Sequence, residues 1–282
     1  MKVVLFCGGL GLRMRSHPDD IPKPMVRIGY RPILWHLMKY YAHFGHKEFI
    51  LCLGWKADTI KQYFLHYEEA LSNDFVLHAG GNRVELVNRD IEDWSITFVD
   101  TGVSSNISQR LAAVADLLRD EPAFLANYTD GLTDLHLPHM IDAFEASRAK
   151  AMFLSVRPRQ TFHTVSIQDG GEVTSIVPIE DSGVWMNGGF FIFRPEVLDL
   201  LDGEELVDGP FRRLIERKEL HTYRYEGFWS CMDTYKEVQT LEDLHLQGRA
   251  VWEVWKRPPE ANGRTSGSAV KVADPAGNGD PC

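Results

Sequence analysis

The sequence predicts an α/β protein with a mixed, mainly parallel central sheet flanked by helices. Strand-length apolar runs alternate along the chain with stretches of helical pattern, which is typical of crossover connections between parallel strands. The first apolar run leads directly into glycines, as at the ligand-binding edge of such a sheet. The chain has 282 residues, 44% of them hydrophobic and 25% charged, which is enough to bury one large core or two modest ones.

Seven apolar runs have the length of strands and are predicted to form the sheet. They span residues 3–7, 48–53, 95–99, 123–127, 151–156, 189–193 and 221–225. Helical patterns separate several of them, over residues 32–44, 57–66, 108–118, 137–147 and 235–248. This order predicts parallel pairing through most of the sheet and a mixed region after about residue 150.

The charge of the chain restricts its partners. A net charge of -10 and a pI near 5.6 argue against a nucleic-acid or membrane-surface binder, because both kinds of partner favour a basic face. A polyanionic ligand must therefore meet local cations.

The cysteines and the N-terminus predict a cytoplasmic protein. Cys7, Cys52, Cys231 and Cys282 have no Cys-x-x-Cys spacing, and three of them lie in apolar or aromatic surroundings typical of reduced thiols. The first apolar run, residues 3–7, is too short for a signal peptide or a membrane span.

The C-terminal segment is predicted to be a flexible tail. Residues 258–282 are rich in Pro, Gly, Ser, Ala and Asp without large apolar side chains, so they cannot offset the entropy lost on ordering. Residues 1–257 are then expected to form one catalytic domain.

A glycine-rich segment, residues 8–11, follows the first predicted strand. Its backbone N–H groups can reach phosphate oxygens, and Arg13 and Lys23 could flank a triphosphate. No Gly-Lys-Ser/Thr of a P-loop follows, and Met14 stands where a dinucleotide-binding motif has its third glycine. We expect another kind of phosphate loop, with a plain tight turn as the alternative.

Asp130 and Asp233 are candidate ligands of Mg²⁺. Asp130 follows the apolar run 123–127 and precedes Gly131, so we expect it at the carboxyl end of a strand with room for a ligand. Asp233 follows a short aromatic stretch, residues 227–229, just before a predicted helix. Carboxylates together with substrate phosphates and waters are the ligands that Mg²⁺ prefers in phosphoryl transfer. Alternatively, each aspartate forms a turn or caps a helix.

Many ordered motifs resemble those of the sugar nucleotidyltransferases, in particular the glucose-1-phosphate cytidylyltransferases. The similarity extends to about residue 256 and includes the segments 8–13, 22–25, 32–36, 99–102, 128–131, 187–191, 227–229 and 232–234, with Trp252 and Trp255. The resemblance implies a Rossmann-like sheet of the nucleotide-diphospho-sugar transferase type.

The resemblance also implies an activity and its site. The enzyme would join a nucleoside triphosphate, with CTP favoured, to a sugar-1-phosphate and release pyrophosphate. It would use Mg²⁺ held by Asp130 and Asp233, bind neither nucleic acid nor membranes, and form a homo-oligomer. The implied catalytic residues are Arg13 and Lys23. The implied nucleotide-binding residues are Cys7, Gly8, Gly9, Leu10, Gly11, Leu12, Arg110 and Asp130, and the implied acceptor-binding residues are His163, Asn187 and Gly188.

Several positions depart from the family's pattern. Leu12 replaces a threonine, and segment 108–113 keeps only the arginine and leucine of Gly-Gly-Arg-Leu-Lys-Arg, so the base is left open. Residues 177–179 are Val-Pro-Ile where the family has Glu-Lys-Pro, and His163 replaces a glycine. The cation for the acceptor would then be His163 or another residue, with Arg157 and Arg159 as alternatives.

These departures leave three alternatives to a sugar-1-phosphate nucleotidyltransferase. The acceptor could be a non-hexose phosphate or a phosphonate. The chain could be a nucleotide-sugar-binding relative without turnover, although retention of Arg13, Lys23, Asp130 and Asp233 argues against that. A nicotinamide-dependent oxidoreductase is disfavoured by Met14.

Overall fold

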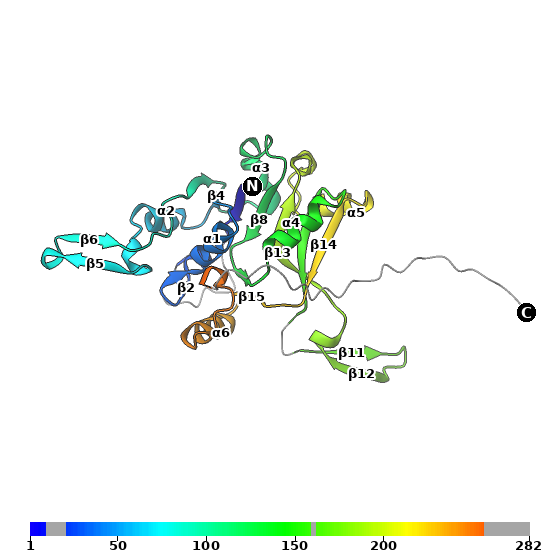
Figure 1. Ribbon diagram of the computed structural model, residues 1–282. Helices are drawn as coiled ribbons and strands as arrows, with labels where there is room; N and C mark the ends of the chain where they lie inside the picture. The colour runs from blue at the N-terminus through cyan, green and yellow to red at the C-terminus, as the bar shows by residue number, and fades with distance from the viewer. Residues whose placement is uncertain (10–20, 159–161, 257–282) are drawn as a thin grey trace, which may run out of the picture.

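The computed structural model describes residues 1–9, 21–158 and 162–256. Its centre is a seven-stranded sheet with the strand order β14-β10-β13-β8-β1-β4-β7 (Figure 1). In chain order these strands are β1 (Val3–Phe6), β4 (Glu48–Leu53), β7 (Ser95–Asp100), β8 (Phe124–Tyr128), β10 (Ala151–Val156), β13 (Met186–Phe193) and β14 (Leu220–Tyr225). The predicted tail, residues 258–282, lies outside the described residues.

All seven predicted strands belong to this sheet. The pairs β1–β4, β1–β8, β4–β7 and β10–β14 are parallel. β13 alone runs antiparallel to its neighbours β8 and β10, which confirms the expected mixed region after residue 150. β13 begins earlier than predicted, at Met186, because Met186 and Asn187 pair with β10.

Six α-helices are described: α1 (Ile33–His43), α2 (Ala57–Leu65), α3 (Ile107–Ala113), α4 (Leu137–Glu145), α5 (Pro210–Glu216) and α6 (Tyr235–Leu246). Five match the predicted helices. α3 ends earlier than predicted because the chain continues in a 3-10 turn at Ala115–Leu117. The sequence reading missed α5, which is only seven residues long and therefore shows little helical periodicity.

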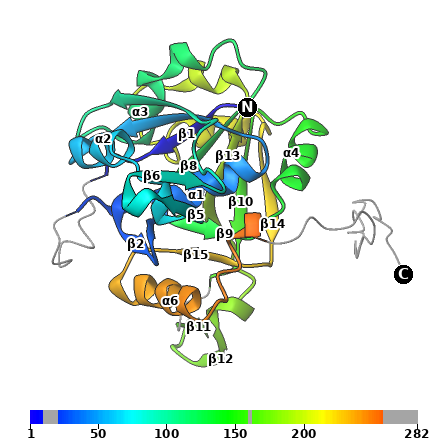
Figure 2. The ribbon, with the colours of Figure 1, turned by 60° about the vertical axis from the view of Figure 1, so that its left-hand side comes forward.

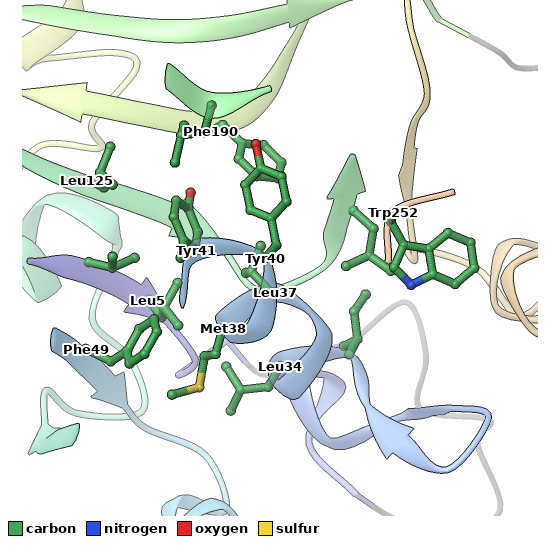
Figure 3. Close-up of a cluster of buried hydrophobic side chains, with 14 of the residues drawn as sticks. Leu5, Leu34, Leu37, Met38, Tyr40, Tyr41, Phe49, Leu125, Phe190 and Trp252 are labelled. Carbon is green, nitrogen blue, oxygen red and sulfur yellow. The ribbon is translucent and has the colours of Figure 1, made fainter. Parts of the chain in front are cut away.

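The sheet is buried on both faces. Val3 and Leu5 of β1 pack into one core, whereas Val4 and Phe6 pack into the other. The first core lies against α1, whose Leu34, Leu37 and Met38 meet β1 and β4, and whose Tyr40 and Tyr41 meet Phe190 of β13 (Figure 3). Burial on both faces explains why the five central strands, β1, β4, β8, β10 and β13, read as nearly continuous apolar runs instead of alternating ones.

Four two-stranded ladders were not predicted. They are β2 (Arg27–Ile28) with β3 (Arg31–Pro32), β5 (Phe75–His78) with β6 (Arg83–Leu86), β9 (Gly131–Thr133) with β15 (Trp229–Cys231), and β11 (His163–Ile167) with β12 (Val173–Pro178). The hairpins β5–β6 and β11–β12 project from the body (Figure 1), and β11–β12 still lies at the lower edge after the turn in Figure 2. Among the described residues, no helix is both long and apolar enough to cross a membrane.

Candidate active site

A pocket of about 520 Å³ opens where β1 and β8 end. Parallel neighbours end at the same edge of a sheet, and ligands of α/β proteins bind at that edge. Six residues predicted for the site contribute to its wall: Cys7, Gly9, Lys23, Arg110, Asp130 and Asp233. The pocket therefore brings together residues from five separate parts of the chain.

Lys23 lies between the two predicted metal ligands. Its Nζ atom is 2.6 Å from Oδ2 of Asp130 and 2.5 Å from Oδ1 of Asp233. Burial alone would lower the pKa of Lys23, but the two carboxylates outweigh it and raise the pKa above its ordinary value. Lys23 therefore stays protonated, and its single positive charge offsets part of the negative charge of the two carboxylates.

The short β9–β15 ladder explains why the two aspartates meet. β9 starts directly after Asp130, and β15 ends two residues before Asp233. The strands pair antiparallel, and the N–H of Met232 donates to the carbonyl of Asp130 at 2.8 Å. Residues a hundred positions apart in the chain are thus fixed side by side by backbone hydrogen bonds.

Glu237 fixes the backbone of the Asp233 segment. Its Oε2 accepts hydrogen bonds from the N–H groups of Asp233 and Thr234, both at 2.8 Å. Thr234 is the N-cap of α6 and forms a reciprocal capping box with Glu237. The predicted aspartate is thus the neighbour of the cap residue and not the cap itself.

The donor set fits a hard cation. Asp130 and Asp233 direct carboxylate oxygens at one ammonium group, so a positive charge is already stabilised between them. No cluster of three or more His, Cys, Asp or Glu side chains suited to a metal was found in the described part of the chain. Two carboxylates suffice for Mg²⁺ where substrate phosphates and waters complete the shell.

Arg110 lies buried beneath the glycine segment. Its guanidinium donates to the carbonyls of Gly8 at 2.9 Å and Leu53 at 3.2 Å, and to the hydroxyl of Thr101 at 2.8 Å. These acceptors follow β1, end β4 and follow β7, so one side chain joins three strand ends. Burial lowers the pKa of Arg110 below its ordinary value. A Cβ atom on Gly8 would lie 1.9 Å from the Arg110 Nη1 atom, which explains the need for glycine there.

The remaining nucleotide-binding predictions fall in two groups. Cys7 lines the pocket, but its N–H donates to the carbonyl of Cys52 at 2.9 Å, and burial raises the pKa of its thiol. Gly9 also lines the pocket. The residues of the second group, Leu10, Gly11 and Leu12, lie outside the described residues, as does the predicted catalytic residue Arg13.

The three acceptor-binding predictions do not line this pocket. His163 is an exposed residue at the start of β11, paired with Pro178. Asn187 and Gly188 lie at the start of β13, where the carbonyl of Gly188 accepts a hydrogen bond from Trp229 Nε1 at 2.9 Å. Gly188 is therefore tied to Trp229 of β15, whereas His163 lies on the projecting hairpin β11–β12.

The sequence reading missed other parts of the wall. Ser104, Ser105 and Asn106 line the pocket at the N-terminus of α3, and Glu205 lines it from a distant loop. Asn106 had a local signal, because the pattern Asn-x-x-Gln is a capping box and the structure shows both of its hydrogen bonds. Glu205 had none.

The chain is similar to several known proteins. Residues 2–230 match the model of the nucleotidyl transferase family. The chain is 39% identical to the glucose-1-phosphate cytidylyltransferase of Salmonella typhi over 91% of this chain and 100% of that protein. It is 40% identical to the probable glucose-1-phosphate cytidylyltransferase of Bacillus subtilis, over 90% of this chain and 100% of that protein.

Solved structures share the fold. A UDP-glucose pyrophosphorylase complexed with UDP-glucose superposes with a TM-score of 0.64 at 15% identity, covering 88% of this chain and 99% of that one. HddC from Yersinia pseudotuberculosis superposes with a TM-score of 0.62 at 18% identity, covering 86% of this chain and 99% of that one.

Proposed function

This chain belongs to the nucleotidyl transferase family, and from that premise we propose that it joins CTP to a sugar-1-phosphate and releases pyrophosphate. The chain is a nucleotidyltransferase. CTP and a sugar-1-phosphate follow from the names of the relatives in Salmonella typhi and Bacillus subtilis. The observation that carries the proposal is the placement of Lys23 between Asp130 and Asp233 in the pocket at the strand ends.

The proposed reaction is an in-line displacement at the α-phosphorus of CTP. A phosphate oxygen of the acceptor forms a bond to that phosphorus, the bond to the β-phosphate oxygen breaks, and pyrophosphate leaves with the electron pair. The reaction needs no covalent protein intermediate, so the protein supplies positioning and charge neutralisation.

The cations of the site would neutralise the negative charge of the triphosphate. Lys23 would hold phosphate oxygens near the reacting centre, and Arg13 would hold the leaving pyrophosphate. Arg110 would add positive charge beneath Gly8, where its guanidinium donates to the Gly8 carbonyl, and backbone N–H groups of the glycine segment would meet the triphosphate. Mg²⁺ bound by Asp130 and Asp233 would neutralise charge on the phosphates.

A pyrophosphate-release assay tests the proposal. The four nucleoside triphosphates are each combined with a panel of sugar-1-phosphates, other sugar phosphates and phosphonates in the presence of Mg²⁺. CTP with a sugar-1-phosphate should give the fastest release. A phosphonate or non-hexose phosphate as the best acceptor would keep the chemistry and correct the substrate. Binding of nucleotide sugars without release in any combination would support a binding protein instead.

The proposal extends to the setting of the enzyme. The described cysteines are free thiols, as expected in a reducing cytoplasm. The hairpin β5–β6 exposes Phe75, Val76, Leu77 and Val84, which a second copy of this chain would cover in a homo-oligomer. Sedimentation velocity of wild type and of a Leu77→Asp variant tests this, because the variant should shift the protein toward monomer.

A further inference from the structure

Two arginines lie near the ring of Trp185 at one end of the sheet. The guanidinium carbon of Arg157 lies 4.1 Å from the ring centroid of Trp185, and that of Arg224 lies 5.9 Å from it. Arg157 follows β10, Trp185 precedes β13 and Arg224 belongs to β14, so three strands build this Arg-Trp-Arg cluster. Stacking on an aromatic face holds a guanidinium in place while its edge can still donate hydrogen bonds.

The Arg-Trp-Arg cluster shares one face of the sheet with Asn187. Ser155 of β10 is paired with Asn187 on one side and with Arg224 on the other, and paired residues point to the same face. Arg157 lies two residues after Ser155, and Trp185 lies two residues before Asn187. Because side chains alternate between the two faces of a sheet, both belong to the same face as Ser155 and Asn187. Val156, between Ser155 and Arg157 in sequence, packs into the core on the opposite face.

The Arg-Trp-Arg cluster carries two positive charges without a counter-ion in the described part of the chain. Neither Arg157 nor Arg224 forms an ion pair with a described carboxylate, and Arg157 donates only a long hydrogen bond, 3.4 Å, to the carbonyl of Val184. Two neighbouring cations attract an anion more strongly than either does alone. An oxyanion is the ligand that paired guanidinium groups bind best.

The two arginines of the cluster start from strands that lie two and three places away from β8 in the sheet. Asp130 follows β8, and β13 separates β8 from β10, with β14 beyond. At about 4.8 Å between neighbours, β10 is roughly 10 Å and β14 roughly 14 Å from β8. If the reacting phosphate of the acceptor is held near Lys23 and Asp130, the Arg-Trp-Arg cluster can bind a different part of the same acceptor.

We propose that the Arg-Trp-Arg cluster binds a second oxyanion of the acceptor, on the side of the sugar away from the phosphate that reacts. The inference rests on the proposed function and narrows it. The substrate class becomes a sugar-1-phosphate that also bears a carboxylate or a second phosphate. Asn187 lies on the same face between the two anion sites, where its amide can meet sugar hydroxyls.

Three acceptors that differ in their anionic groups, each combined with CTP and Mg²⁺, test the proposed second anion site. Glucose-1-phosphate has one anionic group, glucuronic acid 1-phosphate adds a carboxylate, and glucose-1,6-bisphosphate adds a phosphate. For wild type, kcat/KM should be about 10-fold higher for at least one doubly anionic acceptor than for glucose-1-phosphate. The better of the two identifies the oxyanion.

Substitutions assign that preference to the cluster. Arg157→Gln and Arg224→Gln should each lower the ratio of kcat/KM between the doubly anionic acceptor and glucose-1-phosphate by about 10-fold, mainly through KM for the acceptor. Arg157→Lys should retain part of the preference. Arg212→Gln, which removes an exposed arginine of α5, should leave the ratio unchanged.

Two outcomes overturn the inference in distinguishable ways. Equal kcat/KM for all three acceptors, or equal ratios in wild type and both Gln variants, rejects the second anion site and leaves the proposed function standing. Absence of pyrophosphate release with every nucleotide and acceptor rejects the proposed function and this inference with it.

Discussion

The backbone N–H of Met232 donates to the carbonyl of Asp130 at 2.8 Å. This hydrogen bond extends the β9–β15 ladder by one residue at each strand, to Asp130 and to Met232, the residue before Asp233. The acidic pair is therefore a property of the backbone pairing and not of flexible side chains that meet by chance. Groups held in this way need little reorganisation when a charged ligand binds.

Removal of either carboxylate should abolish metal-dependent turnover. Asp130→Asn and Asp233→Asn each remove one carboxylate charge from the proposed Mg²⁺ site while keeping the shape of the side chain, so we expect kcat to fall about 100-fold or more. Pyrophosphate release measured against Mg²⁺ concentration checks this, and circular dichroism checks the fold. Asp116→Asn, at a fully exposed aspartate, is the matched control. Wild-type turnover in either site variant would remove that residue from the site.

Lys23→Met should weaken the protein most when Mg²⁺ is absent. Without the ammonium group, the carboxylates of Asp130 and Asp233 repel each other; both are partly solvated, so the cost in unfolding free energy should be about 1–2 kcal/mol. Urea denaturation with and without Mg²⁺ measures it, and Mg²⁺ should stabilise the variant more than wild type. Lys47→Met, at an exposed pair with Asp93, is the control. Equal stabilisation by Mg²⁺ in wild type and Lys23→Met would contradict the placement of the Mg²⁺ site at Asp130 and Asp233.

Glu237 should act on Asp233 and not only on helix α6. Glu237→Ala removes the acceptor of two backbone N–H groups, so the Mg²⁺ concentration for half-maximal activity should rise about 10-fold. Thr234→Ala removes the other half of the capping box and should cost about 1 kcal/mol of stability without that rise. If both variants shift the Mg²⁺ dependence equally, Glu237 only caps the helix.

Arg110→Met should destabilise the edge of the sheet that carries the pocket. The substitution leaves the buried carbonyls of Gly8 and Leu53 without this donor, at a cost of about 2–4 kcal/mol in unfolding free energy. Among folded molecules, KM for CTP should rise because the positive charge beneath Gly8 is lost. Chemical denaturation and steady-state kinetics measure the two effects. Arg119→Met, on the surface, should change neither.

His36 should make stability fall in mild acid. Burial lowers the pKa of His36 to about 3 in the folded protein, so the unfolded chain binds a proton first as pH drops below about 6.5. The stability is therefore full above that pH and lost progressively toward pH 3, by about 2 kcal/mol at pH 5. Urea denaturation at pH 7 and 5 should show a smaller loss for His36→Gln than for wild type. The exposed His66→Gln should behave like wild type, and equal losses in all three proteins would assign the effect to other groups.

The sequence by itself determined the strands and the candidate chemistry. The five central strands of the sheet, β1, β4, β8, β10 and β13, were readable because burial on both faces makes them nearly continuous apolar runs, whereas the edge strands β7 and β14 are exposed at several positions. The glycine segment, Lys23, Asp130 and Asp233 were readable because loops at strand ends carry their chemistry in residue type. Helix α5 and the paired β9 and β15 were not readable, since a helix of seven residues spans barely two turns and a strand of three residues is too short for an apolar run.

Only the tertiary structure decided which of these residues act together. The pairing of β9 with β15 joins segments a hundred residues apart, and no local pattern specifies such a contact. The same holds for Arg110 beneath Gly8 and for the Arg-Trp-Arg cluster, whose members come from β10, β14 and the residue before β13. Sheet order and register place these side chains, and both are fixed by the sum of packing on two faces and not by any short stretch of sequence.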